Sequence, residues 1–231
     1  MTAPTTHPAQ LLLPGQAAAP EGPVDLAAMY VMHRAFRRDA DAFAAAAAAT
    51  PVADRRRWAR LSRRFALFAG ILHKHHHGED VGLWPLLRER GADPEVLDAM
   101  QAEHAHIDPL LASCSGDLAA LARGAGEETR RRLIGCTARL RDLLSAHLGH
   151  EERDGMALVQ RHLGPADWQR LDREVFAKEY RPRDIPAVLA WVMSGLPDEA
   201  ARRMPGANPV MLAVGRLLVR RFERAEARTF G

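Results

Sequence analysis

Apolar residues recur every three or four positions along four long stretches of the chain, which predicts four amphipathic helices. Residues such as Asp54 and Asp93-Pro94 stand where helices begin, and Gly164-Pro165 stands where the last should end. The predicted helices cover about residues 24–49, 54–84, 93–112 and 127–163. Because the links between them are short, the pattern favours an all-α, up-down-up-down four-helix bundle over residues 23–164.

Prolines and glycines mark the segments outside the predicted helices. Residues 1–22 contain four prolines and little periodicity, which predicts a flexible or loosely draped N-terminal arm with its leucines 11–13 able to dock. Residues 113–126 are rich in glycine and serine, which predicts a break between the third and fourth helices. Residues 165–231 look helical but are interrupted by prolines, and they are too short for a good core of their own. We therefore expect a helical C-terminal extension packed on the bundle.

Composition narrows the class of protein. The chain has 231 residues, of which 47% are hydrophobic, and no stretch alternates apolar and polar residues as a strand would. Its net charge of +3 arises from arginines with acidic neighbours, so no nucleic-acid partner is expected. Cys114 and Cys136 lack metal-binding spacing and should be reduced. No long uncharged apolar run or leader-like start is present, which favours a cytoplasmic protein without a membrane partner.

The buried stripes of the predicted helices contain polar residues at one level. A histidine or glutamate on such a stripe costs several kcal/mol of desolvation unless it is paired, hydrogen-bonded or bound to metal. The pair His75 and Glu79 is spaced by four residues, as is the pair His147 and Glu151, so both members of each pair share a helical face. The six candidate metal ligands lie on all four helices: His33, His75, Glu79, His104, His147 and Glu151.

This set of ligands restricts the metal. Four imidazoles and two carboxylates without a thiolate suit iron, with manganese or zinc less favoured. If both carboxylates bridge, the protein supplies about eight bonds of the roughly twelve that two octahedral ions need, which leaves room for an oxo or hydroxo bridge and an external ligand. A single structural zinc would need only four ligands, usually including cysteine. Two iron ions are therefore expected.

Two further residues, His76 and Tyr30, extend the candidate site. His76 lies three residues before Glu79 and can face inward as a seventh ligand. Tyr30 lies one turn before His33. Its phenol is either an ordinary core hydroxyl bonded to a backbone carbonyl or a donor to a bridging carboxylate or an iron-bound ligand.

The pattern H…HHxxED…LWPLL…EH…HxxxE over residues 24–163 resembles hemerythrin-like, HHE cation-binding proteins. The resemblance implies a four-helix bundle with a non-haem di-iron site, in which the six residues above are the ligands. Oxygen-carrying hemerythrins have two histidines four residues apart on the third helix, whereas here Asp108 follows His104. This departure argues against reversible oxygen carriage. Asp108 is either an extra ligand or an acceptor for an imidazole N–H.

Two functions remain open at this point. The first is a di-iron protein that binds or reacts with dioxygen, hydrogen peroxide or nitric oxide, with possible weak catalase-like or peroxide- or nitric oxide-consuming activity. The second is a non-enzymatic iron- or oxygen-sensing module whose C-terminal extension signals to a partner protein that the sequence does not identify. Tests of turnover and of conformational change distinguish them.

Overall fold

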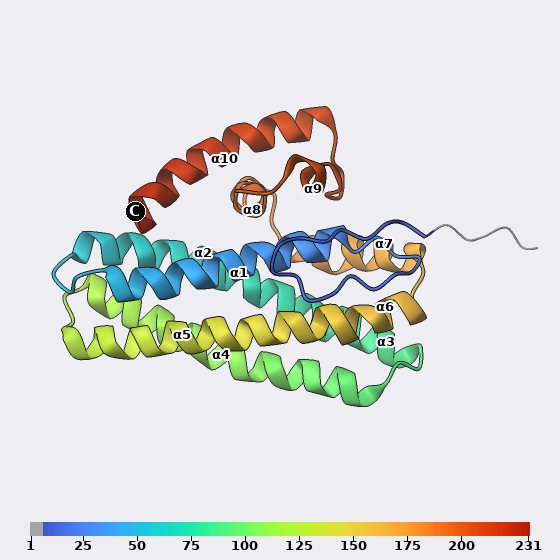
Figure 1. Cartoon of the computed structure of the whole chain (residues 1–231), viewed down its shortest axis with the longest axis horizontal. Helices are drawn as coiled ribbons and strands as arrows, with labels where there is room; N and C mark the ends of the chain where they lie inside the picture. Colours follow the sequence, from blue (N-terminus) through green and yellow to red (C-terminus); the bar gives the residue numbers. More distant parts are fainter. Residues whose placement is uncertain (1–6) are drawn as a thin grey trace, which may run out of the picture.

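The computed structural model describes residues 7–231, and all its regular elements are helical, with no strand in that part of the chain. The all-α prediction is confirmed. Figure 1 shows the arrangement of the elements. Their bounds are α1 Ala27–Ala49, α2 Arg55–Gly78, η1 Glu79–Leu83, α3 Trp84–Glu89, α4 Pro94–Ala122, α5 Glu127–His150, η2 Glu151–Gly155, α6 Met156–His162, α7 Pro165–Glu174, η3 Phe176–Glu179, α8 Ile185–Met193, α9 Asp198–Arg202 and α10 Pro209–Phe230.

The long helices α1, α2, α4 and α5 lie alongside one another and are joined by short connections (Figure 1). Local chemistry sets where they begin: the side chain of Asp54 accepts a hydrogen bond from the backbone N–H of Arg57, at 2.9 Å, and Asp93 caps α4 in the same way, ahead of Pro94. The apolar stripes meet in one core, whose largest buried side chains include Trp58, Trp84, Phe36, Phe65 and Phe68. Burial of these stripes is the main force that holds the helices together.

One predicted helix boundary is wrong. The expected break at residues 113–126 is confined to residues 123–126, because α4 continues through its serines and Gly116 to Ala122. Cys114, Leu118 and Leu121 keep the buried stripe going there, and packing outweighs weak local helix propensity. The helix ends at Ala122, and Gly124, two residues later, has a φ of +104° that favours glycine. At Trp84-Pro85, where the sequence predicts that the second helix bends or ends, the π turn η1 passes into α3, with Pro85 in its first turn.

The C-terminal segment, α7 to α10, lies against the bundle and is fixed at a buried carboxylate. The indole N–H of Trp191 on α8 donates to Oδ2 of Asp39 on α1 at 2.7 Å, and the guanidinium of Arg64 on α2 donates to the same oxygen at 2.6 Å. Arg64 also donates to Glu226 on α10 at 2.8 Å. Trp191 is wholly buried. The extension is therefore attached through polar contacts that satisfy buried groups as well as through apolar packing.

The described part of the predicted N-terminal arm, residues 7–22, packs on the bundle, while residues 1–6 lie outside the described residues. Leu11 and Leu13 are buried, so the expected docking of this segment occurs. The side chain of Gln10 donates to the carbonyl of Val24 at 2.9 Å, and the backbone N–H of Ala17 donates to Glu152 at 2.7 Å. These hydrogen bonds give an irregular segment the partners that its polar groups need.

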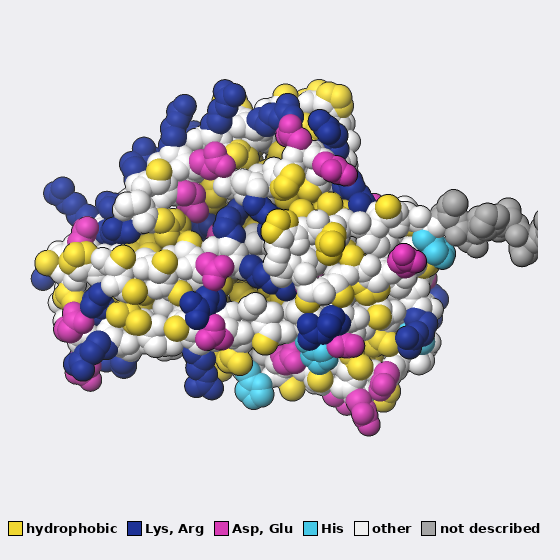
Figure 2. All heavy atoms as spheres, viewed as in Figure 1, with side chains coloured by type: hydrophobic (Ala, Val, Ile, Leu, Met, Phe, Trp, Pro, Cys, Tyr) yellow, Lys and Arg dark blue, Asp and Glu magenta, His cyan; other side chains and the backbone are white. Residues whose placement is uncertain are grey.

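The surface of α10 is basic. Figure 2 shows Lys and Arg side chains gathered along this helix, and the exposed arginines are residues 216, 220, 221, 224 and 228.

Among the described residues, no helix combines the length and apolar character needed to cross a membrane.

Candidate metal centre

Two π-helical turns shape the centre of the bundle. The segment η1 begins at Glu79, directly after α2, and η2 begins at Glu151, directly after α5. The backbone N–H of Trp84 donates to the carbonyl of Glu79, five residues earlier. In the same way, the backbone N–H of Met156 donates to the carbonyl of Glu151. Such widened turns are frequent at functional sites. A Cβ on Gly155 would lie 3.2 Å from Cγ of Glu151, so this glycine leaves room for the glutamate side chain.

The first group of candidate ligands consists of His33, His75, Glu79 and Glu151, all buried, with one ligand atom of each within 4.8 Å of the others. Nε2 of His75 lies 3.0 Å from Glu79 and 3.3 Å from Nε2 of His33. Nε2 of His33 lies 3.2 Å from Glu151. Two imidazoles and two carboxylates therefore converge from α1, α2 and the two π turns.

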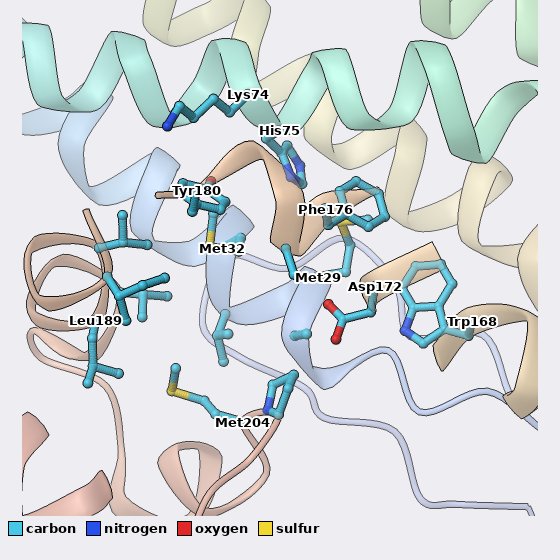
Figure 3. A pocket seen from close by; sticks show the side chains of 17 residues that line it. Met29, Met32, Lys74, His75, Trp168, Asp172, Phe176, Tyr180, Leu189 and Met204 are labelled. Atoms are coloured by element: carbon cyan, nitrogen blue, oxygen red, sulfur yellow. The ribbon is translucent and has the colours of Figure 1, made fainter. Parts of the chain in front are cut away.

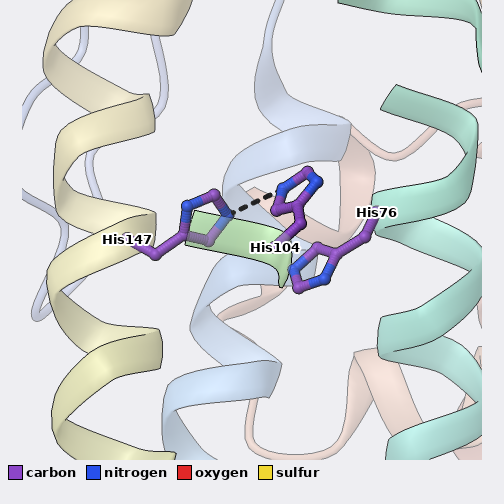
Figure 4. A group of neighbouring side chains, drawn as sticks. All are labelled: His76, His104 and His147. Atoms are coloured by element: carbon purple, nitrogen blue, oxygen red, sulfur yellow. Dashed lines mark hydrogen bonds between the residues drawn. The ribbon is translucent and has the colours of Figure 1, made fainter. Parts of the chain in front are cut away.

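The second group consists of His76, His104 and His147, from α2, α4 and α5 (Figure 4). The Nε2 atoms of His104 and His147 are 3.2 Å apart. The ring of His76 stacks on that of His104, with centroids 3.9 Å apart. Neither ring nitrogen of His76 has a hydrogen-bond partner among the described residues, although both are buried. Three imidazoles thus meet at one point inside the bundle.

The two glutamates connect the groups. Glu79 lies near His75 on one side, and its other oxygen is 3.5 Å from Nε2 of His104. Glu151 lies near His33 and is 3.9 Å from Nε2 of His147. No carboxylate oxygen of either glutamate has a hydrogen bond of good geometry within the described chain. Because an unsatisfied buried carboxylate is costly, these oxygens are suited to a cation between the two groups.

Three of the imidazoles have a carboxylate next to Nδ1, on the side of the ring that faces away from the centre. Nδ1 of His33 lies 3.0 Å from Glu152, Nδ1 of His104 lies 2.9 Å from Asp80, and Nδ1 of His147 lies 2.8 Å from Glu103. Each carboxylate accepts the Nδ1 proton, which leaves the Nε2 lone pair directed into the centre. This arrangement is typical of metal-binding histidines.

Sequence reasoning missed these three carboxylates, although a signal for them exists. Asp80 directly follows Glu79, Glu152 directly follows Glu151, and Glu103 directly precedes His104. On a regular α-helix the neighbour of an inward residue points about 100° away from it, so these acids looked like surface residues. The π turns that begin at Glu79 and Glu151 change that register for Asp80 and Glu152, whereas Glu103 on α4 contacts His147 of the neighbouring helix α5.

The structure brings together the six predicted ligands and the possible seventh, His76. Asp108, by contrast, is exposed and lies outside both groups, because Ile107 occupies the buried stripe at that point of α4. The expected role of an acceptor for His104 belongs to Asp80. Tyr30 is buried, and its hydroxyl has no hydrogen-bond partner among the described residues.

Burial is the largest single influence on the pKa values of the candidate ligands. It lowers the pKa of His75 to about 3, and it also lowers the pKa values of His76 and His147. Burial alone would lower the pKa of His33 as well, but the carboxylates of Glu151 and Glu152 outweigh it and raise that pKa to about 9. Burial and the neighbouring Glu151 raise the pKa of Glu79. A bound cation would favour the charged form of Glu79 and so act against this effect.

The donor set fits a metal. Buried imidazoles that are mostly neutral, together with partnerless carboxylates, are ready-made ligands for a borderline or hard divalent cation. The family model of the Hemerythrin HHE cation binding domain matches residues 24–159. The chain belongs to this family. The resemblance inferred from the sequence is thereby confirmed, and the clusters of histidine and glutamate in this hemerythrin-like domain can hold a metal ion. No match was found among curated proteins or among solved structures.

Proposed function

We propose that the protein is a non-haem di-iron protein that binds or reacts with dioxygen, hydrogen peroxide or nitric oxide. The observation that carries the proposal is the position of Glu79 and Glu151, each between an imidazole of the first group and one of the second. Two carboxylates in that position suit two ions better than one. In this reading, α1, α2, α4 and α5 form an up-down-up-down bundle around the centre, as their short connections suggest.

The chain's own residues would divide into two sets. His33 and His75 would hold one ion, and His104, His147 and His76 the other, with Glu79 and Glu151 shared between them. His76 supplies a fifth imidazole from α2, so the site is less open than six ligands would leave it. Glu152, Asp80 and Glu103 hold a proton at Nδ1 of their partner histidines and so keep Nε2 free to bind.

Bound iron would supply vacant coordination positions and one-electron redox chemistry toward a small oxygen-derived ligand. The protein's contribution is to exclude bulk water, since His33, His147, Glu79 and Glu151 are at most 1% exposed. Low polarity around the site strengthens each electrostatic contact within it. The proposal includes a role in oxidative or nitrosative stress defence, with weak consumption of peroxide or nitric oxide.

A sensor without turnover is the alternative, and one chain of contacts favours it. The ring of Phe36 lies 5.1 Å from the ring of His75 and 5.1 Å from the ring of Trp191. Trp191 belongs to α8 and donates to Asp39, so a movement of His75 would be transmitted by packed side chains to the C-terminal extension. The extension would then be the surface that a partner protein recognises.

Elemental analysis and an absorption spectrum of aerobically purified protein test the proposal. We expect about two metal ions per chain, mostly iron, and a near-ultraviolet oxo-iron band that changes on addition of peroxide. In Glu79→Ala and Glu151→Ala, iron content should fall strongly, whereas Glu128→Ala, which changes an exposed glutamate, should retain it. One zinc per chain without iron, or full iron in both site variants, would contradict the proposal. Measured consumption of peroxide or nitric oxide favours the enzyme, and metal-dependent protease sensitivity of residues 165–231 without consumption favours the sensor.

A further inference from the structure

A cavity of about 380 Å³ lies between the bundle and the C-terminal extension. Figure 3 shows its walls: Met29 and Met32 come from α1, Trp168 and Asp172 from α7, and Leu189 from α8. Other lining residues include His75, Phe176, Tyr180 and Met204. The extension therefore does more than cover the bundle, since it completes a hollow that opens beside a candidate metal ligand.

The cavity is built for a larger guest than a diatomic gas. Pockets for organic ligands typically measure about 300–1,000 Å³ and are mostly apolar, with a few polar groups that orient the guest. Here the walls are mainly methionine, aliphatic and aromatic side chains. Flexible methionines adapt to apolar guests of different shape, and the lining includes the aromatic rings of Trp168 and Phe176, a residue type that attracts cations.

Two charged side chains lie at different parts of this apolar lining. Lys74 has partners already: its Nζ lies 3.3 Å from Asp184 and 4.7 Å from the ring centroid of Tyr180. Asp172 has neither a hydrogen bond nor an ion pair within the described chain, and its side chain points into the hollow next to Trp168 (Figure 3). Burial raises the pKa of Asp172, and no cation acts against that effect. The unbalanced charge in the cavity is thus negative.

We propose that this cavity binds a small organic amine with an apolar body, its ammonium group at Asp172 and its body against Met29, Met32 and Leu189. A cationic head would give the partly buried carboxylate the partner that it lacks, and aromatic walls would contribute cation–π attraction. Alcohols of the same shape would keep the apolar contacts only, and carboxylates would be repelled. This proposal goes beyond the di-iron function, because it rests on the cavity and not on the metal.

If the centre holds iron, as proposed above, a guest in the cavity should also affect it, because the cavity reaches His75. His75 lines the cavity, whereas its Nε2 faces Glu79 and His33. Its Nδ1 has no carboxylate behind it in the described chain, unlike the Nδ1 atoms of His33, His104 and His147. A guest in the cavity would alter the surroundings of this imidazole and thereby the spectrum of the iron-loaded centre.

Titration calorimetry with 4-phenylbutylamine, 4-phenylbutan-1-ol and 4-phenylbutyrate tests the proposal. It is done on full-length protein in iron-loaded and metal-depleted form, so that failure of the cavity and failure of the di-iron assignment are distinguished. We expect the amine to bind at least about tenfold tighter than the alcohol, and the acid to bind weakest. Asp172→Asn should remove the preference for the amine and leave alcohol binding within about twofold. Glu174→Gln, which neutralises an exposed carboxylate on the same helix, should change neither.

A second variant tests where the probe binds. Leu189→Trp fills the cavity from a half-buried position on α8 and should abolish binding of all three compounds, while circular dichroism and iron content stay unchanged. Equal affinity for amine and alcohol in the wild type, or an unchanged amine preference in Asp172→Asn, would overturn the proposal. So would undiminished binding to folded Leu189→Trp. An amine-dependent shift of the iron absorption band that Leu189→Trp abolishes would support the link through His75.

Discussion

Glu152 and His33 form a fully buried pair in which Oε1 of the carboxylate lies 3.0 Å from Nδ1 of the ring. The carboxylate is itself held by Arg37 at 2.7 Å and by the backbone N–H of Ala17 at 2.7 Å. His33 thus has one nitrogen anchored by a rigid acceptor and the other facing Glu151. The N-terminal segment takes part in this anchoring, so its docking serves the candidate metal centre.

Glu152→Gln should lower iron affinity about tenfold, because it removes the charge that orients His33 and raises its basicity. Competition with a chelator measures the affinity, and thermal unfolding of the metal-free protein shows whether the variant folds. Glu128→Gln, at an exposed position on α5, is the matched control. Unchanged affinity in a folded Glu152→Gln protein would show that His33 does not need this partner.

His76→Phe should retain the stack on His104 but remove both ring nitrogens, which are buried without partners. If His76 is a ligand, the variant should lose about one of two iron ions and change the visible spectrum. His77→Phe serves as the control, since that side chain is 48% exposed. Wild-type iron content and spectrum in His76→Phe would reduce His76 to a packed core residue.

The regular spacing of apolar residues is sufficient to predict the class of fold and the inward position of the six candidate ligands. His75 and Glu79 continue the same stripe as Phe68 and Leu72, and that continuity brings them to the core. The position of Asp80 could not be predicted in this way. Its contact with His104 depends on the π turn that begins at Glu79, and no local residue pattern announces a five-residue hydrogen-bonded turn.

The C-terminal cavity also escaped prediction, for a different reason. Residues 165–231 have apolar runs interrupted by prolines. The runs predict that these side chains are buried, but they do not predict which part of the protein covers them. The docking of Trp191 on Asp39 joins residues 152 positions apart, and such a contact is set by tertiary packing. Asp39 itself looked like an ordinary polar residue of the first helix. Its burial becomes understandable only when Arg64 and Trp191 are both in place.

Cys114 and Cys136 are free, with sulfur atoms 2.6 Å apart, across α4 and α5. Their closeness predicts a disulfide upon treatment with hydrogen peroxide. The Cys136 thiolate attacks one peroxide oxygen and the O–O bond breaks, which gives a sulfenic acid and a hydroxide ion; the Cys114 sulfur then attacks the sulfenic sulfur, and the sulfenic oxygen leaves as water with the thiol proton. Closing a loop of this length should stabilise the fold by about 3 kcal/mol. Intact mass, which falls by two hydrogens, and thermal unfolding measure the result. Only intermolecular products, or a change in Cys114→Ser as large as in wild type, would contradict it.

The same reaction should depend on pH. The hydrogen bond from Cys114 lowers the pKa of Cys136 to about 7, while that bond and burial raise the pKa of Cys114. Below about pH 7 the Cys136 thiol is protonated and should react slowly, and the rate should rise as pH passes through about 7 and then level off. Labelling kinetics in Cys114→Ala, where the hydrogen bond is missing, should show a higher midpoint. A rate that is flat from about pH 6 to 9 would show that Cys136 is not the attacking thiolate.

Tyr30 lies one turn before His33 on α1, and its buried hydroxyl has no hydrogen-bond partner among the described residues. Burial and the carboxylates of Glu152 and Glu151 raise its pKa, so the phenol stays protonated and able to donate. Tyr30→Phe should leave the metal-free protein as stable as before, within about 1 kcal/mol, since no hydrogen bond is lost. With iron bound, the absorption band and reactivity with peroxide should shift. Tyr180→Phe, the chain's other tyrosine, is the control for the loss of a phenol outside the centre. An unchanged spectrum and unchanged peroxide reactivity in Tyr30→Phe would make Tyr30 a core residue alone.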